Sequence, residues 1–340
     1  FDNVYSYNDI LDDRSITPTD REEFIARRYA LSLDDIFTLI YTSGTTGNPK
    51  GVILTHRNIM YNVLTLPEII ALRETDRFVS ILPSWHIFER ACEYLALSQG
   101  CCTVYSSVKT FATDLETYKP TLVATVPRLW ESMYTKINQT LEKQNPRKAR
   151  IFKKLVAISA TFRFHRRRLK NQLPRFRRLN PLIAAGQKLA SMCLVTLLFL
   201  PYRVAQKKLA AVQARFGGRL RMAISGGGSL PAYLDEWIDA IGIRIVNAYG
   251  MTECAPAIAG RALNCEIFGT LGPPTKGTEL RIVAEDGRSL PAGEEGEIQV
   301  RGEQVFPGYY QDDEENRSAF TTDGFFRTGD LGKLTLSGEL

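Results

Sequence analysis

Short apolar runs alternate with longer amphipathic segments along residues 36–260. Residues 36–42 form a near-continuous apolar run, which is typical of a strand covered on both faces. Residues 87–97 and 231–241 repeat their apolar positions at helical spacing instead. The pattern predicts further strands at 52–54, 77–82, 102–105, 121–126, 220–224 and 243–246, and further helices from His56 and Pro127. Alternation of this kind predicts an α/β fold, a mostly parallel sheet layered with helices.

The pattern changes after about residue 260. Glycine and proline become frequent, and short strands are expected at 279–283, 297–300 and 332–336 with no helix between them. We therefore expect three parts, a leading segment 1–35, an α/β core 36–260 and a small β-rich subdomain 261–340 of the distorted-barrel type. Because the chain starts at Phe1 and ends inside an expected hairpin, we interpret it as a piece of a longer protein.

The charges are unevenly distributed. The net charge is +6, yet the 92 residues from Lys143 to Leu234 hold 21 of the 43 Lys and Arg and none of the 37 Asp and Glu. Apolar residues recur at helical spacing inside this block, which predicts a basic, largely helical insertion over 143–219 that ends at Gly217 and Gly218. Such helices are typical of anionic membrane surfaces. The alternative is a solvated face, and the absence of a nucleic-acid motif argues against nucleic acid.

Composition narrows the class of protein further. The chain has 340 residues, 44% of them apolar and 24% charged, as in soluble globular proteins. The longest apolar stretch, 189–200, is shorter than 18 residues, so we expect a buried or interfacial helix and no membrane span. Six cysteines without a CxxC pair indicate free thiols rather than a zinc site. We expect a cytoplasmic protein, with peripheral membrane contact as the open question.

A loop rich in hydroxyl groups and glycine follows the first expected strand. Residues 41–51 read YTSGTTGNPKG and contain a single lysine, Lys50. Hydroxyls, backbone N–H groups and one ammonium group are donors for phosphate oxygens, and glycine permits close approach. The loop matches neither the Walker A pattern nor the GxGxxG pattern. It therefore predicts another kind of phosphate-binding loop, the alternative being a plain surface turn.

This loop resembles the signature of the adenylate-forming superfamily, which includes acyl-CoA synthetases, luciferases and adenylation domains of peptide synthetases. The resemblance extends over the whole chain except the first thirty or so residues and the basic insertion. It implies that the loop holds the β- and γ-phosphates of ATP and that Lys50 faces the leaving pyrophosphate. It also implies a small C-terminal domain, absent from this chain, that supplies another catalytic lysine.

Later motifs follow in the order of that family. Residues 225–228 read SGGG, residues 247–253 read NAYGMTE, residues 308–310 read GYY, and residues 323–330 read DGFFRTGD. By resemblance, the glycine turn passes along the adenine, Tyr249 stacks on it and Asp330 binds the ribose hydroxyls. Thr252 binds the α-phosphate and Glu253 helps to hold Mg²⁺. The implied nucleotide-binding residues are Thr42, Ser43, Gly44, Thr45, Thr46, Gly47, Lys50, Gly226, Gly227, Gly228, Asn247, Tyr249, Gly250, Thr252 and Asp330.

Two segments resemble the long-chain fatty acid:CoA ligase subgroup. Residues 82–90 read LPSWHIFER and residues 125–131 read TVPRLWE. The resemblance places His86 beside the acyl carboxylate, whereas its residue type alone suggests a histidine at a helix start. The implied catalytic residues are Lys50, His86, Thr252 and Glu253. The implied substrates are a long-chain fatty acid, ATP with Mg²⁺, and CoA as the second substrate.

Three functions remain open at this point. The leading hypothesis is activation of a long-chain fatty acid to acyl-AMP, followed by thioester formation with CoA. Within the same superfamily, the alternatives are an acyl–acyl carrier protein synthetase and a fatty acyl-AMP ligase. From a different class, the alternative is a non-catalytic membrane-associated protein in which the basic insertion is the functional part.

Overall fold

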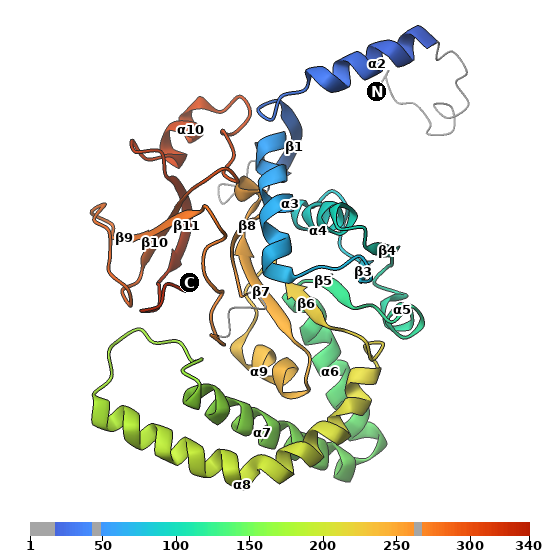
Figure 1. The fold of residues 1–340 in the computed structure, drawn as a ribbon, viewed down its shortest axis with the longest axis vertical. Coiled ribbons are helices and arrows are strands. Elements are labelled where there is room, and N and C mark those ends of the chain that lie inside the picture. The colour runs from blue at the N-terminus through green and yellow to red at the C-terminus, as the bar shows by residue number, and fades with distance from the viewer. Residues whose placement is uncertain (1–17, 43–48, 262–266) are drawn as a thin grey trace.

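A six-stranded sheet forms the centre of the protein (Figure 1). The computed structural model describes residues 18–42, 49–261 and 267–340. Its strand order is β4-β3-β5-β6-β7-β8, with all neighbours parallel except the antiparallel pair β7 and β8. The predicted α/β class is therefore confirmed. The strands are β3 (Arg77–Ser80), β4 (Cys102–Tyr105), β5 (Leu122–Thr125), β6 (Met222–Ser225), β7 (Ile245–Gly250) and β8 (Ala257–Gly260).

Helices cover both faces of this sheet. Successive side chains of each strand point to opposite faces, and apolar side chains on both faces need a covering layer. On one face, Leu122 and Ala124 pack with α3 (His56–Ile70) and α4 (Ile87–Ser98). On the other, Val123 packs with α5 (Phe111–Tyr118), α6 (Pro127–Gln144) and α9 (Ala232–Ala240). The inward stripe expected for the last helix is confirmed, since these residues are buried: Leu234, Trp237, Ile238 and Ile241.

The β-rich subdomain is a three-stranded antiparallel sheet of β9 (Glu279–Val283), β10 (Gly296–Arg301) and β11 (Phe326–Gly332). The expectation of no helix between these strands was wrong, because α10 (Asp313–Ala319) precedes β11. Asp312 caps this helix by accepting the Glu315 N–H at 3.1 Å. A strand at 332–336 was also wrong: Leu336 N–H donates to Arg175 O in another segment rather than to a ladder.

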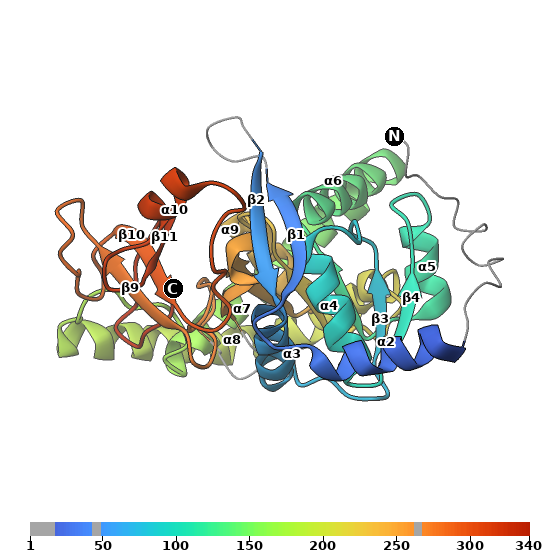
Figure 2. The same ribbon diagram turned by 90° about the horizontal axis from the view of Figure 1, so that it is seen from above.

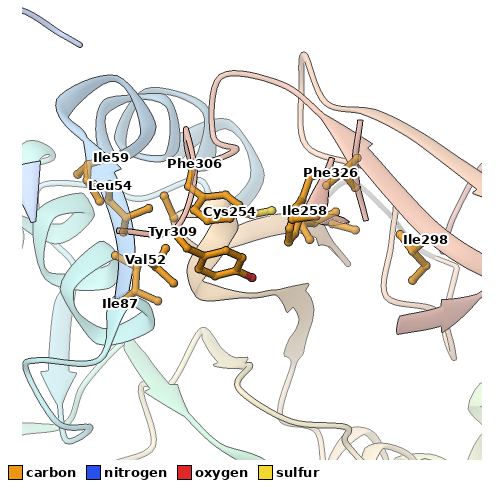
Figure 3. Close-up of a cluster of buried hydrophobic side chains, with 14 of the residues drawn as sticks. Val52, Leu54, Ile59, Ile87, Cys254, Ile258, Ile298, Phe306, Tyr309 and Phe326 are labelled. Atoms are coloured by element: carbon orange, nitrogen blue, oxygen red, sulfur yellow. The ribbon is translucent and has the colours of Figure 1, made fainter. Parts of the chain in front are cut away.

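The hairpin of β1 (Ile36–Thr42) and β2 (Lys50–Thr55) packs in one hydrophobic cluster with residues of β8, β10 and β11. A strand buried on both faces was predicted for 36–42, yet Ile36 and Tyr41 are each 62% exposed. Ile36, Leu39 and Tyr41 on one face of β1 are exposed, so no layer covers that face among the described residues. Val52 and Leu54 of β2 are fully buried and contribute to a cluster with Phe306, Tyr309 and Phe326 (Figure 3). In Figure 2 the hairpin stands between the β9–β11 sheet and α4.

The basic insertion is an antiparallel pair of helices, α7 (Pro146–Leu169) and α8 (Pro181–Ala214), as its helical spacing predicted. Gly217 and Gly218 follow α8 with positive φ, which confirms the predicted C-terminal stop. Figure 1 shows α8 along the rim of the molecule, with α7 between it and α9. The remaining elements are α2 (Pro18–Ala30) and a single 3₁₀ turn, η1 (Thr252–Cys254).

The apolar stretch 189–200 lies within α8 and is mostly exposed. The expectation of a buried helix was therefore wrong, while an interfacial helix remains a prediction. Among the described residues, α8 alone is long and apolar enough to cross a membrane, by length and composition only. Counting unbroken apolar residues missed this because the run stops at Lys188 and Pro201, whereas an 18-residue window that includes one or two charges still has a high mean hydropathy.

Candidate functional site

Two cavities meet at the carboxyl ends of β6 and β7, the edge where α/β sheets bind ligands. The first, the apolar cavity, has a volume of about 290 Å³. Seven of the predicted site residues line it: His86, Gly226, Gly227, Tyr249, Gly250, Thr252 and Glu253. Its walls come chiefly from apolar side chains of α3, α4 and the sheet: Leu66, Ile69, Ile70, Phe88, Ala91, Cys92, Leu95, Ile224 and Val246.

The second has a volume of about 580 Å³, and apolar side chains such as Leu271 and Ile298 contribute to its lining. We call it the polar cavity because it also holds Asn247, Tyr249 and Asp330, which give it a larger polar share than the first. It shares Gly227, Ala248, Tyr249 and Gly250 with the apolar cavity. The glycine turn, the β7 motif and the end of β11 thus converge, although they lie far apart in sequence. This convergence is what the late motifs implied.

Tyr249 and Asp330 are in direct contact. The Tyr249 hydroxyl donates to Asp330 Oδ2 at 2.7 Å. Burial, and then the neighbouring Asp330 carboxylate, raise the pKa of Tyr249 above its usual value. The phenol therefore stays protonated and holds the carboxylate at the boundary between the two cavities.

Asn247 lines the polar cavity and carries a buried, unpaired acceptor. Its side chain is buried, and Oδ1 has no hydrogen-bond partner among the described residues. A buried amide oxygen without a donor is costly, so the position favours a ligand that supplies an N–H or O–H group. An exocyclic amine of a nucleobase is a donor of this kind.

Two glycines of the site are required by the backbone. Gly227 has φ +70°, a left-handed conformation that side chains disfavour. A Cβ at Gly250 would lie 2.0 Å from the Pro256 carbonyl oxygen, so β7 and the segment after η1 approach each other closely only with glycine there.

Lys50 and Glu253 both contact Tyr309. Lys50 Nζ is 2.6 Å from Glu315 Oε1 of α10 and 5.4 Å from the centre of the Tyr309 ring. The Tyr309 hydroxyl donates to Glu253 Oε1 at 3.0 Å. Burial and Glu253 together raise the pKa of Tyr309, so this phenol remains a donor.

Glu253 suits a magnesium ion that is held mainly by phosphates. The carboxylate is buried, and no ion pair between it and a Lys or Arg occurs among the described residues. Within that part of the chain no group of three His, Cys, Asp or Glu residues forms a metal site. Mg²⁺ commonly takes one or two carboxylates plus phosphate oxygens and water, so a single buried Glu fits this mode.

Most of the predicted phosphate loop lies outside the described residues. This holds for Ser43, Gly44, Thr45, Thr46 and Gly47. Thr42 and Lys50, which flank the loop, are paired opposite each other in the β1–β2 ladder. The loop thus joins two antiparallel strands, whereas the sequence suggested a strand of the buried sheet before it.

His86 is the N-cap of α4 as well as a wall of the apolar cavity. Its Nδ1 accepts the Phe88 N–H at 3.2 Å, so this nitrogen carries no proton and Nε2 carries it. Desolvation by the surrounding protein lowers the pKa of His86. The helix-start interpretation of this histidine therefore holds alongside its predicted place beside the acyl group.

Replacing His86 separates these two roles. His86→Ala is expected to lose the cap, about 1 kcal/mol of unfolding free energy, whereas His86→Asn restores a capping oxygen. Both are expected to slow the activity that the resemblance implies, because both remove the imidazole from the cavity. Urea unfolding and an activity assay measure the two effects; an Asn variant with full activity would contradict the cavity role.

The burial of His86 predicts a pH dependence of stability. Because desolvation holds the folded-state pKa of His86 below its usual value, the stability it contributes is present above about pH 6.5 and is lost as the pH falls. The unfolding free energy of the wild-type protein is expected to fall relative to His86→Asn between about pH 7.5 and 5. A constant difference over that range would contradict a buried, uncharged His86.

Glu89, next to the cavity, is a buried acid of another kind. It is fully buried, bonded to Ser80, and burial raises its pKa to about 7. Glu89 does not line either cavity, so its contact with Ser80 serves to fix the start of α4 against β3. Arg90 points elsewhere and donates to Thr38 Oγ1 of β1 at 3.0 Å.

Two residues of the site have no role in the sequence-based prediction. Tyr309 lies within the GYY motif, but nothing local indicates that it bridges Lys50 and Glu253. Glu315 follows a run of acidic residues, and only the position of α10 shows that it reaches Lys50. The GYY motif could have indicated Tyr309, whereas no signal in the sequence indicated Glu315.

Residues 4–310 match the family described as AMP-binding enzyme, and the chain belongs to that family. The sequence-based assignment to the adenylate-forming superfamily is thereby confirmed.

Curated relatives include enzymes of fatty acid activation. The chain is 34% identical to "Probable acyl-activating enzyme 16, chloroplastic" of Arabidopsis thaliana, over 98% of this chain and 47% of the relative. It is also 34% identical to "Long-chain-fatty-acid--[acyl-carrier-protein] ligase AEE15, chloroplastic" of that organism, covering 97% and 46%. It is 33% identical to "Long-chain-fatty-acid--CoA ligase FadD15" of Mycobacterium bovis, covering 94% and 48%. The chain spans about half the length of these relatives.

Solved structures share the fold. A long-chain-fatty-acid-CoA ligase (FadD1) from Archaeoglobus fulgidus superposes with a TM-score of 0.62 at 25% identity, over 90% of this chain and 50% of that one. An ATP-bound RpMatB-BxBclM chimera superposes with a TM-score of 0.63 at 24% identity, over 91% and 48%.

Proposed function

We propose that this protein takes part in the ATP-dependent activation of a long-chain fatty acid to its acyl-AMP. The observation that carries the proposal is the junction of an apolar cavity and a polar cavity at Tyr249, with His86, Thr252 and Asp330 around it. An acyl chain fits the first cavity and a nucleotide the second, so the carboxylate and the α-phosphate would meet between them.

The chemistry at that junction needs positioning and charge neutralisation. A fatty acid carboxylate is already ionised near neutral pH and attacks phosphorus without a general base. The obstacle is the repulsion between this anion and the triphosphate, together with the charge that develops on pyrophosphate. Lys50 supplies a cation, Thr252 a donor, and Glu253 would help to hold Mg²⁺, which neutralises phosphate charge when bound. Asp330 accepts hydrogen bonds from the ribose hydroxyls in place of the Tyr249 hydroxyl.

The walls of the apolar cavity support an aliphatic substrate over a polar one. The lining residues that α3 and α4 contribute are Leu, Ile, Phe, Ala and Cys side chains. A hydrophobic pocket gains only about 0.8 kcal/mol for each buried methylene, so it favours long chains without selecting one length sharply. Relatives named for long-chain fatty acids agree with this substrate class.

The acceptor of the acyl group is proposed to be CoA. The relatives include one named for acyl carrier protein and another named for CoA, so both acceptors belong to the test. A fatty acyl-AMP ligase would use neither. Chloroplastic and bacterial relatives leave the compartment of this protein open, and the cytoplasm remains our proposal.

The function is tested with the protein at its natural length, Mg-ATP and labelled palmitate. We expect AMP and palmitoyl-CoA to form when CoA is present, and shorter acids such as acetate to react poorly. Acylated carrier protein without palmitoyl-CoA would support the second acceptor. Accumulation of acyl-AMP alone would support the fatty acyl-AMP ligase, and no product in any arm would favour the non-catalytic alternative.

A further inference from the structure

The outer surface of α8 is a continuous apolar stripe. We define the α8 stripe as these exposed residues: Leu182, Leu189, Cys193, Leu197, Leu200 and Val204. Their spacing of seven, four, four, three and four residues keeps them on one side of a helix. With a rise of 1.5 Å per residue, the stripe is about 33 Å long.

The opposite side of α8 belongs to the protein core. Ser191, Ala205 and Leu209 are buried there, at helical spacing from one another. The Phe162 ring of α7 stacks on Tyr202 with 4.0 Å between centroids, and His165 Nδ1 lies 3.0 Å from Ser191 Oγ. The stripe is therefore the face that α8 leaves uncovered among the described residues, and its exposure does not result from a detached helix.

Exposed cations stand at both ends of the stripe. Arg177 and Arg178 precede α8, and Lys207 and Lys208 follow the last stripe residue. Residues 189–202 between them carry no charge, and no Asp or Glu occurs anywhere from Lys143 to Leu234. An apolar stripe with basic ends and no acidic residue is complementary to acyl chains beneath a layer of anionic headgroups.

We propose that the α8 stripe docks this protein on the surface of an anionic lipid membrane, with α8 lying parallel to the surface. The stripe enters the boundary between headgroups and acyl chains, while the basic residues at its ends contact phosphate groups. The proposal rests on α7 and α8 alone, so it stands or falls separately from the proposed enzymatic function.

A membrane-spanning position of α8 conflicts with its contacts. The Ser191 hydroxyl and the Gln206 amide would face lipid if α8 left α7, and Gln206 Nε2 now donates to the Ala240 carbonyl at 3.0 Å. α7 is itself tied to α9, since Arg167 makes two hydrogen bonds to the Asp239 carboxylate at 2.6 and 2.8 Å. A helix held in this way exposes one face to lipid, as an in-plane helix does.

Charge argues against a second copy of this chain as the occupant. Two such hairpins placed face to face would bring their basic ends together with no acidic side chain from 143–234 to offset them. Like charges at an interface oppose association. Anionic lipid satisfies both the apolar stripe and the cations.

Vesicle co-sedimentation of the full protein tests the proposal. Vesicles of phosphatidylcholine alone are compared with vesicles containing phosphatidylglycerol, at low and high salt. The variant Leu197→Glu with Leu200→Glu places two charges on residues that are each 73% exposed, so folding should survive. The matched control is Leu97→Glu with Val108→Glu, at sites 75% and 78% exposed outside α8.

We expect salt-sensitive binding to the anionic vesicles. The stripe variant should have a partition coefficient lower by about tenfold or more, because two leucine side chains would no longer enter the membrane. The control should bind as the wild type does. Equal binding of stripe variant and control, or no binding to anionic vesicles, would overturn the proposal. So would a lipid-free dimer, seen by analytical ultracentrifugation, that the stripe variant dissociates.

Two native cysteines report the orientation without mutation. Cys193 lies in the stripe and Cys102 lies on β4, and both are exposed. Anionic vesicles should slow maleimide labelling of Cys193 and leave labelling of Cys102 unchanged, as quantified by mass spectrometry. Equal labelling with and without vesicles would overturn the proposal, and binding that resists both high salt and alkaline carbonate would overturn the in-plane position.

Discussion

Replacing Lys50 by alanine is expected to slow acyl-AMP formation by about 10²–10³-fold, because one preorganised charge on the leaving pyrophosphate is lost. The binding of AMP should change little, since AMP has no pyrophosphate for Lys50 to contact. Acyl-AMP formation is followed in a single turnover of the protein at its natural length, and AMP affinity by calorimetry. An unchanged rate, or equal losses in both measurements, would contradict the assigned role.

The partner of Lys50 supplies a comparison. Glu315 holds the Lys50 ammonium group at 2.6 Å and would compete with phosphate for it. Glu315→Gln is therefore expected to tighten ATP binding without affecting AMP. Glu314→Gln, an exposed neighbour on the same helix, is the matched control and should change neither affinity. Tighter AMP binding in Glu315→Gln would show that the effect does not pass through Lys50.

Replacing Arg261 by methionine is expected to lower the free energy of unfolding by about 3–5 kcal/mol, the usual result of removing one partner of a buried ion pair. Arg261 and Asp235 are 6% and 7% exposed in their side chains and form two hydrogen bonds, at 2.6 and 2.7 Å. The substitution would leave the Asp235 carboxylate buried without its cation.

The control is Arg215→Met, which removes an exposed ion pair with Glu116. Exposed pairs contribute little to stability, so its unfolding curve should overlay that of the wild type. Urea unfolding followed by circular dichroism measures both variants. If Arg261→Met unfolded at the same urea concentration as Arg215→Met, the buried pair would not have the stabilising role assigned to it.

The spacing of apolar residues in the sequence predicted those helices and strands whose apolar residues are buried. The strands at 102–105 and 279–283 occur within the predicted bounds, because their apolar residues and flanking turns are local signals. The run at 36–42 misled us because β1 is apolar without being covered. α10 was missed because its residues are acidic and polar, and its start depends on the Asp312 cap rather than on an apolar stripe.

The candidate site was predictable where a motif marks the end of a strand. Tyr249 and Asp330 were both assigned to the nucleotide, and the structure places their side chains in contact. Tyr309 and Glu315 were not assigned, because their importance depends on which side chains meet across the β1–β2 hairpin and α10. A local sequence pattern does not show which distant side chains come into contact. It does not show the size of the two cavities either.

The most direct test of the central claim is a crystal structure with a non-hydrolysable ATP analogue. The account predicts adenine against Tyr249 in the polar cavity and ribose hydroxyls bonded to Asp330, with the α-phosphate beside Thr252. A nucleotide bound elsewhere, with the hydrogen bond from Tyr249 to Asp330 unchanged and the polar cavity empty, would contradict it.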